Sequence, residues 1–525
     1  MHLPFFKKGS GGPETVLEYD PGTDPALVEA EIPKGLDPVE QYWLEEGRSL
    51  VAIVRDRQSG QAEYHLFEPV LSKFEYEILE RLYEDLRDVL ILSEEEMVAD
   101  RRRVLLSRTH ALIGEYGVSL DRRALAKVEY YLVRDFLGWS RLDGLMKDPD
   151  IEDISCDGVG VPVFLYHRRH KNIRTNLVFA EEELDSLAIS LAQRSGKHVS
   201  VGSPVVDATL PDGSRLQLTF GREVSTRGTS FTVRKFRAEP FTPIELLDLG
   251  TFSAEELAYF WTAIENNKSL LFIGGTASGK TSSLNAVSLF IPPLAKVISI
   301  EDTREITLFH ENWVASVTRD TLSGEESSSI SMFDLLKAAM RQRPEYILVG
   351  EVRGEEAQTL FQAMNTGHTT FSTMHAGTVD AAIHRLENEP LNVPRNMVQA
   401  LDIVSVQALI YRGTERVRRC QEIVEVAGVD PGTGNLRVNT VFAYDPVRDT
   451  MEYTGRSLVY ARVIETRGWD TGRLEADIME RIHVLEAMKA QGIVDYRRVS
   501  RIVQAFATNR TAVLDHLDNL SGLFP

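Results

Sequence analysis

The sequence predicts an α/β protein in which a domain with a mostly parallel sheet follows a smaller α+β domain. Three observations support this fold class. From residue 270 onward, short apolar runs alternate with helix-compatible stretches, as strands and helices do around a parallel sheet. A glycine-rich loop directly follows the first of these apolar runs. Before residue 240, alternating polar and apolar residues separated by turn signals predict antiparallel hairpins.

The composition is that of a globular protein with several domains. The chain has 525 residues, of which 43% are hydrophobic and 26% are charged, and this length predicts about three domains. No stretch approaches the roughly 20 apolar residues of a membrane span, and no secretion signal is present, so we expect a cytoplasmic protein. The net charge of −20 argues against general affinity for nucleic acid. Cys156 and Cys420 are too few for a disulfide framework or a C-x-x-C metal clasp.

The first part of the chain is predicted to be peripheral and then helical. Residues 1–45 are rich in Gly, Pro, Asp and Glu, which favours a loosely ordered acidic extension, with a short folded extension as the alternative. Residues 72–108 form a long, charged stretch with helical periodicity. We therefore predict a helical N-terminal subdomain at residues 46–125.

The two main domains follow. Helix patterns near residues 124–138 and 181–194, together with strand and hairpin patterns up to residue 236, predict an α+β N-terminal domain at residues 126–237. A pair of prolines then interrupts the pattern, which indicates a linker at residues 238–248. The second domain, with a helical C-terminal end, is predicted at residues 249–525.

Strands and helices alternate through the second domain. The carboxyl ends of its parallel strands should share one edge of the sheet, where functional residues gather. The predicted elements are strand 270–273, helix 281–289, strand 297–300, helix 332–341, strand 346–349, strand 370–374, helix 379–387 and helical patterns at 473–490 and 496–508.

The glycine-rich loop matches the phosphate-loop pattern G-x-x-x-x-G-K-[ST]. Its glycines let successive N–H groups face phosphate oxygens, Lys280 reaches the outer phosphates, and the Thr281 hydroxyl can bind Mg²⁺. Chance alone should produce such a match in about 2 per cent of chains this long, but the preceding strand and the following helix N-terminus favour a nucleotide site. The predicted nucleotide-binding residues are Gly274, Gly275, Thr276, Ala277, Ser278, Gly279, Lys280, Thr281 and Ser282.

Three further motifs lie at the ends of predicted strands. They are Glu301-Asp302, Gly350-Glu351 and the histidines His368 and His375. Each has an ordinary alternative, because acidic residues often cap helices and a lone histidine is usually structural. Together and in this order they indicate nucleotide hydrolysis, which needs a carboxylate to activate water, an acid near Mg²⁺ and polar groups that sense the terminal phosphate.

These motifs resemble those of the secretion and type IV filament ATPases, a superfamily of type II secretion, type IV pilus, VirB11-like and archaellum motors. Residues 274–281 look like its Walker A motif and residues 300–305 like its Asp box. Residues 347–353 look like its atypical Walker B motif, which carries Gly-Glu in place of an acidic pair, and residues 367–376 like its His box. The resemblance covers about residues 140–430. It implies a RecA-like P-loop NTPase domain that uses ATP and Mg²⁺.

The resemblance also implies residue roles. Glu301 is expected to be the general base and Glu351 to meet the metal together with Thr281, although the two glutamates could exchange roles. His375, with His368 as a weaker candidate, would sense the phosphate.

Arginine fingers in this superfamily come from the smaller domain. Arg215 and Arg234 occupy matching places, and Arg222 or Arg227 could substitute for a second finger that falls on Thr-Ser in this chain.

The whole-molecule function implied by the resemblance is that of a hexameric motor. Each α+β domain would pack on the RecA-like domain of the next subunit with ATP between them. Hydrolysis would act on a platform protein of the cytoplasmic membrane, with which the ring associates peripherally, to assemble or rotate a pilus-like filament or archaellum, or to drive type II-like secretion. Two isolated cysteines cannot form the tetracysteine zinc site of many bacterial relatives, and residues 221–236 and 367–377 look more like the archaeal branch.

Two other functions compete with the motor. A nucleic-acid translocase or helicase of RecA-like fold would need a basic face, which the net charge of −20 argues against. A nucleotide-gated scaffold without turnover would usually lose one of the four residues Lys280, Thr281, Glu301 and Glu351, whereas all four are present.

Overall fold

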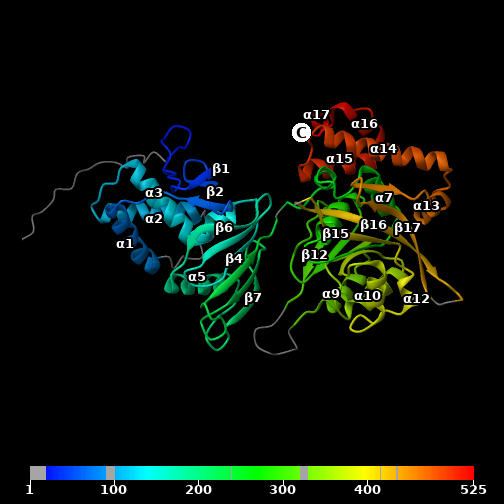
Figure 1. The fold of residues 1–525 in the computed structure, drawn as a ribbon, viewed down its shortest axis with the longest axis horizontal. Coiled ribbons are helices and arrows are strands. Elements are labelled where there is room, and N and C mark those ends of the chain that lie inside the picture. The colour runs from blue at the N-terminus through cyan, green and yellow to red at the C-terminus, as the bar shows by residue number, and fades with distance from the viewer. Residues whose placement is uncertain are drawn as a thin grey trace, which may run out of the picture. The chain divides into compact units, whose positions relative to one another are not determined.

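The structure is a computed structural model that describes residues 19–89, 101–237, 239–319, 329–413, 415–432 and 435–524. The chain divides into two compact units, Met1–Phe236 and Arg237–Pro525. Each unit is built on its own sheet (Figure 1). Parts of the predicted N-terminal extension (residues 1–18) and of the predicted helical stretch (residues 90–100), as well as linker residue 238, lie outside the described residues.

Within its described residues, unit 1 has a nine-stranded sheet in the order β1-β2-β3-β6-β5-β4-β9-β8-β7. Neighbouring strands are antiparallel except β3 and β6. The strands are β1 (Leu36–Glu45), β2 (Ser49–Asp56), β3 (Ala62–Phe67), β4 (Ile151–Cys156), β5 (Pro162–His167), β6 (Lys171–Val178), β7 (Val205–Thr209), β8 (Arg215–Thr219) and β9 (Ser230–Arg234).

The helices of unit 1 form two groups. One group, α1 to α3, has its own apolar cluster, which includes Leu82, Leu105 and Val128. Helix α5 instead packs on the sheet, because Leu184, Ala188 and Leu191 join the core of the strands. The helices are α1 (Lys73–Val89), α2 (Arg101–Glu115), α3 (Arg122–Leu132), α4 (Asp143–Lys147) and α5 (Glu181–Arg194).

Strands β1 to β3 occupy a region where the sequence predicts a loosely ordered extension and the start of a helical subdomain. Edge strand β1 contains a proline and several acidic residues. These residues protect a sheet edge from pairing with other chains, and they are also typical of loops. In β2, the consecutive residues Val51 to Val54 are all fully buried, so no alternating pattern marks this strand. Pairing between β1 and β2 therefore forms a structure that composition does not indicate.

The described part of unit 2 has a nine-stranded sheet in the order β12-β11-β13-β14-β10-β15-β16-β17-β18. Strands from β12 to β15 are parallel, and β16 to β18 extend the sheet in antiparallel fashion. The strands are β10 (Leu270–Gly274), β11 (Val297–Glu301), β12 (Trp313–Val317), β13 (Tyr346–Val349), β14 (Thr369–His375), β15 (Ile403–Arg412), β16 (Glu415–Val429), β17 (Leu436–Asp445) and β18 (Thr450–Tyr453). The predicted α/β class with a mostly parallel sheet is confirmed.

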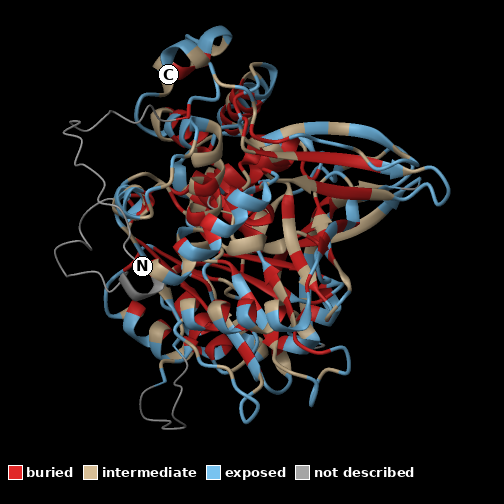
Figure 2. Cartoon of the chain, turned by 90° about the vertical axis from the view of Figure 1, so that its left-hand side faces the viewer, coloured by how far each residue is buried: buried red, intermediate tan, exposed pale blue. Residues whose placement is uncertain are grey.

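Helices cover both faces of this sheet. Side chains of β10 alternate between two apolar clusters, with Leu270 and Phe272 in one and Leu271 and Ile273 in the other. Figure 1 shows α7, α14 and α15 on one side and α9, α10 and α12 on the other. Figure 2 shows buried residues on strands and on the helices that cover them. The helices are α6 (Pro243–Asp248), α7 (Ala254–Glu265), α8 (Lys280–Val287), α9 (Met332–Met340), α10 (Glu356–Asn365), α11 (Val379–Glu387), α12 (Arg395–Val398), α13 (Leu458–Arg467), α14 (Thr471–Ala490), α15 (Tyr496–Thr508), α16 (Arg510–Leu514) and α17 (Leu520–Leu523).

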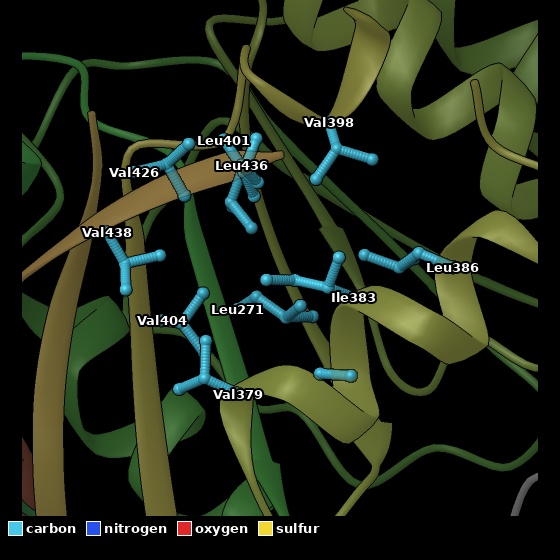
Figure 3. Close-up of a pocket in the computed structure, with 11 residues that line it drawn as sticks. Leu271, Val379, Ile383, Leu386, Val398, Leu401, Val404, Val426, Leu436 and Val438 are labelled. Atoms are coloured by element: carbon cyan, nitrogen blue, oxygen red, sulfur yellow. The ribbon is translucent and has the colours of Figure 1, made fainter. Parts of the chain in front are cut away.

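An apolar cavity lies between α11 and the strands β10, β15, β16 and β17 (Figure 3). Its lining side chains, among them Leu271, Ile383 and Val404, converge and leave about 10 Å³. A single water needs at least roughly that volume together with polar partners. The cavity is therefore a small packing gap in the core and has no room for a nucleotide.

Among the described residues, we find no helix with the length and apolarity needed to cross a membrane.

Candidate nucleotide site

The glycine-rich loop connects the buried strand β10 to helix α8, the context that a phosphate loop requires. Gly274 has no room for a side chain, because a Cβ there would lie 2.2 Å from the carbonyl oxygen of Gln407 and 2.4 Å from Ser278 Oγ. Ala277 adopts a φ of 59°, in the left-handed region. The Ser278 hydroxyl closes the turn by donating to the carbonyl of Gly275 at 2.9 Å.

Lys280 is the first residue of α8, and its side chain folds back over the loop. Its Nζ donates to the carbonyls of Gly274 at 3.1 Å and Gly275 at 2.9 Å. The N–H groups at the start of α8 and the lysine ammonium are thus gathered around one turn of backbone. This arrangement fits the phosphates of a nucleotide.

The strand register brings the other predicted motifs to the same edge of the sheet. Gly274 lies beside His375 of β14 in the parallel register. The next strand, β13, ends at Val349, just before Gly350, and β11 ends at Glu301. The His375 side chain is exposed at this edge.

Glu301 is a buried carboxyl at the end of β11, with an exposed fraction of only 2%. Its Oε1 accepts from the backbone N–H groups of Glu305 and Ile306, both at 2.9 Å. Its Oε2 is buried and has no hydrogen-bond partner among the described residues. Burial raises the pKa of Glu301 to about 7. A carboxyl with a pKa near neutrality can exchange a proton with water, which is the property of a general base.

The glycine of the Walker B-like motif has a steric explanation. A Cβ at Gly350 would lie 3.1 Å from Glu301 Cγ, so an Asp at this position would press on the Glu301 side chain. Glu351 follows, half-buried, and its Oε2 accepts from Arg353 Nη2 at 2.6 Å. The second Glu351 carboxylate oxygen has no described hydrogen-bond partner.

This edge of the sheet offers few protein ligands for Mg²⁺. Within the described part of the chain, no cluster of three or more His, Cys, Asp or Glu side chains could hold a metal by itself. Mg²⁺ usually takes one or two protein ligands and completes its shell with water and substrate phosphates. The Thr281 hydroxyl and the Glu351 carboxylate match that requirement in type and number.

His368 does not join this edge of the sheet, and the predicted arginine fingers belong to unit 1. His368 precedes β14 at the opposite edge of the sheet, on the order of 20 Å from His375 along the strand, and its ring contacts the end of α10 through the carbonyl of Ala363. Arg215 and Arg234 are in unit 1, as register neighbours on β8 and β9 with exposed side chains. Neither arginine side chain makes a hydrogen bond or salt bridge with another described residue. The substitute Arg222 is paired with Glu181 at 2.7 Å.

Sequence reasoning missed two residues at the loop, both from the segment that follows the predicted strands. The Gln407 side chain accepts from the Ser283 hydroxyl of α8 at 3.2 Å, and its carbonyl confines Gly274. Arg418 Nε donates to the carbonyl of Ala277 at 3.0 Å. Only the pairing of β10, β15 and β16 brings these residues to the loop, so no local motif could have revealed them.

Comparison with known proteins identifies the family of the chain. Residues 175–491, more than half of the chain, match the family described as type II/IV secretion system protein. The chain belongs to this family. Residues 10–70 also match the PilB3-like N-terminal family. The resemblance drawn from the four motifs is thereby confirmed.

Relatives of this family member come from archaea and bacteria. An uncharacterized protein of Methanocaldococcus jannaschii is 38% identical over 385 residues, which cover 72% of this chain and 69% of that protein. The type IV secretion system protein PtlH of Bordetella pertussis is 30% identical over 250 residues, covering 44% of this chain and 73% of PtlH. Among solved structures, the VirB11 ATPase of the Brucella suis type IV secretion system is 24% identical and covers 53% of this chain and 89% of that chain, with a TM-score of 0.27. The family assignment rests on the sequence matches.

Proposed function

We propose that this protein is an ATPase motor that hydrolyses ATP to drive the assembly or rotation of a type IV pilus-like filament, or type II-like secretion. One observation carries the proposal. The parallel register of β10, β14, β13 and β11 gathers the phosphate loop, His375, Glu351 and Glu301 at one edge of the sheet. Family membership supports the same function, since relatives include secretion proteins such as PtlH.

In the proposed mechanism the loop binds the phosphates of ATP through its backbone N–H groups and Lys280. Mg²⁺, held by Thr281 and Glu351, would neutralise charge on the outer phosphates. Glu301 accepts the proton of the attacking water, a role favoured by its buried position and a pKa of about 7. His375, the register partner of Gly274, would sense the terminal phosphate.

The active assembly in this proposal is a cytoplasmic homohexamer that binds a platform protein at the membrane. Arg215 and Arg234 form an exposed pair on unit 1 that is available to the ATP of a neighbouring subunit. The archaeal branch is favoured by the relatives from Methanocaldococcus jannaschii. Direct nucleic-acid binding is not part of the proposal.

The test is steady-state ATPase activity against protein concentration, with the oligomeric state measured in parallel and with double-stranded DNA present or absent. We expect specific activity to rise as hexamers form and to be the same with and without DNA. Lys280→Ala should lose nucleotide binding and turnover, whereas Lys337→Ala, which changes an exposed lysine on α9, should retain both. Normal turnover by Lys280→Ala would refute the site, and strong stimulation by DNA would support a translocase instead.

A further inference from the structure

The hairpin of β15 and β16 extends beyond the phosphate loop. Gly274, the last residue of β10, is level with Gln407, but β15 continues to Arg412 before the chain returns along β16. Five extra residues reach about 16 Å past the end of β10. The hairpin therefore stands beside the place where a nucleotide on the loop would lie.

This hairpin is rich in arginine, although the protein as a whole is acidic. Three of its arginines are engaged within the hairpin or with nearby residues. Arg412 and Arg419 both pair with Asp449, at 2.7 and 2.8 Å. Arg416 Nε donates to the Tyr411 hydroxyl at 2.8 Å.

Arg418 differs because it faces the phosphate loop. It lies opposite Leu409, two positions beyond the level of Gln407. Its Nε donates to the carbonyl of Ala277 at 3.0 Å, and its Cδ would lie 3.2 Å from a Cβ at Gly279. The two terminal guanidinium nitrogens make no hydrogen bond to any described residue. A cation with free donors is thus held against the loop.

The order of the strands indicates which part of a nucleotide this cation would meet. Glu301 and Glu351 follow β11 and β13, on one side of β10, whereas β15 and β16 are on the other side. The terminal phosphate must face the acidic side, where water is activated. The inner phosphates and the sugar therefore extend toward the hairpin.

We propose that Arg418 binds the inner phosphates of the nucleotide held by its own subunit, through its terminal guanidinium nitrogens. The inference rests on the proposed ATP site and adds a binding residue to it. Arg418 strengthens ground-state binding and does not take part in cleavage of the terminal phosphate. It should therefore contribute equally to the binding of ADP and of ATP. Arg215 differs, because its proposed role requires the terminal phosphate and a second subunit.

The experiment is calorimetric titration of the full chain with Mg-ADP and with a nonhydrolysable ATP analogue. Arg418→Ala should weaken the affinity for both nucleotides by on the order of ten- to a hundredfold, the usual effect of losing a charged hydrogen bond. Arg416→Ala is the matched control, because Arg416 is two residues away on the same face of β16 but bonded to Tyr411; its affinities should be unchanged.

A second variant separates direct contact from loop support. Arg418→Gln can still donate to the Ala277 carbonyl but lacks the charge, so we expect it to bind as weakly as Arg418→Ala, with Arg418→Lys partly restored. Wild-type affinity in Arg418→Gln would show that Arg418 only supports the loop, and unchanged affinity in Arg418→Ala would also overturn the proposal. Selective loss of the ATP analogue would assign Arg418 to the terminal phosphate instead. Failure of the wild-type chain to bind either nucleotide would refute the proposed function itself.

Discussion

Glu301 combines burial with a pKa near the physiological pH, because desolvation disfavours its charged form. If its carboxylate is the base, wild-type turnover should increase as the pH rises through about 7. Glu301→Gln should bind ATP and lose turnover by about a hundredfold or more, without that pH dependence. Rates of saturated enzyme between pH 5.5 and 9 provide the measurement.

The same profile distinguishes the two glutamates. Glu351→Gln should retain the inflection in its residual activity, because Glu301 still titrates. A Glu301→Gln variant that keeps both its rate and its inflection would transfer the role of base to Glu351.

Gly350 lies against the Glu301 side chain and leaves little room for a side chain of its own. In Gly350→Ala the new Cβ would lie 3.1 Å from Glu301 Cγ and displace that side chain. We expect a loss of about 1 kcal/mol in the free energy of unfolding and about a tenfold decrease in turnover, with nucleotide affinity retained. Denaturant unfolding and kinetics check these values. Gly114→Ala, in helix α2 where a Cβ meets nothing within 4 Å, is the control. It should leave turnover unchanged and should not lower the free energy of unfolding, because Ala favours a helix more than Gly does. Unaltered turnover in Gly350→Ala would exclude this steric role.

Helix α7 begins with a capping box whose carboxyl is fully enclosed. Glu256 accepts from the backbone N–H of Ser253 at 2.7 Å, while its other oxygen is buried without a partner among the described residues. Burial raises the pKa of Glu256 to about 8. The folded state therefore retains a proton that the unfolded state releases near pH 4.5. Stability should fall as the pH rises from about 4.5 to about 8, by as much as about 1.4 kcal/mol for each pH unit.

Glu256→Gln removes this ionisation and keeps the cap, because glutamine also satisfies a capping box. The unfolding free energy of this variant should decline less over this pH range than that of the wild type. The part of the decline caused by the titration of Glu301 remains. Denaturant unfolding at several pH values measures the difference. Glu255→Gln, which changes the exposed neighbour, should behave like the wild type. Parallel pH profiles for Glu256→Gln and the wild type would show that Glu256 is ionised in the folded protein.

At the scale of the whole molecule, the proposed ring requires residues of two subunits at one site. Arg215→Ala and Lys280→Ala should each be inactive alone, since one lacks a finger and the other a working loop. Mixed at equal amounts, they should regain activity, because about a quarter of the interfaces in a random cyclic ring combine an intact finger with an intact loop. The readout is ATPase activity after co-assembly.

The control for this mixture is a double variant with both substitutions, which should rescue neither partner. Activity of Arg215→Ala alone at the wild-type rate in assembled rings would reject Arg215 as a finger. No gain on mixing would argue that all catalytic groups belong to one subunit.

The geometry of the phosphate loop is encoded locally, and the structure has the strand, turn and helix that the motif predicts. The phosphate loop needs a contiguous strand, glycine turn and helix, so its motif already specifies the local geometry. Strand β13 and helices α5 and α11 match their predicted bounds, because buried apolar runs and helical periodicity are strong local signals. Strands β1 to β3 and β15 to β18 were not predicted, because their stability depends on pairing between strands and on bulges that composition does not reveal.

By itself, then, the sequence determined the fold class, the family motifs and the chemistry of the individual side chains. Only the tertiary structure decided which of them meet. Strand order and register place His375 beside Gly274, fit Gly350 against Glu301, leave His368 at the opposite edge and bring Arg418 to a loop 141 residues away. These placements depend on packing between distant segments, whose free energy cannot be read from any single stretch of the chain.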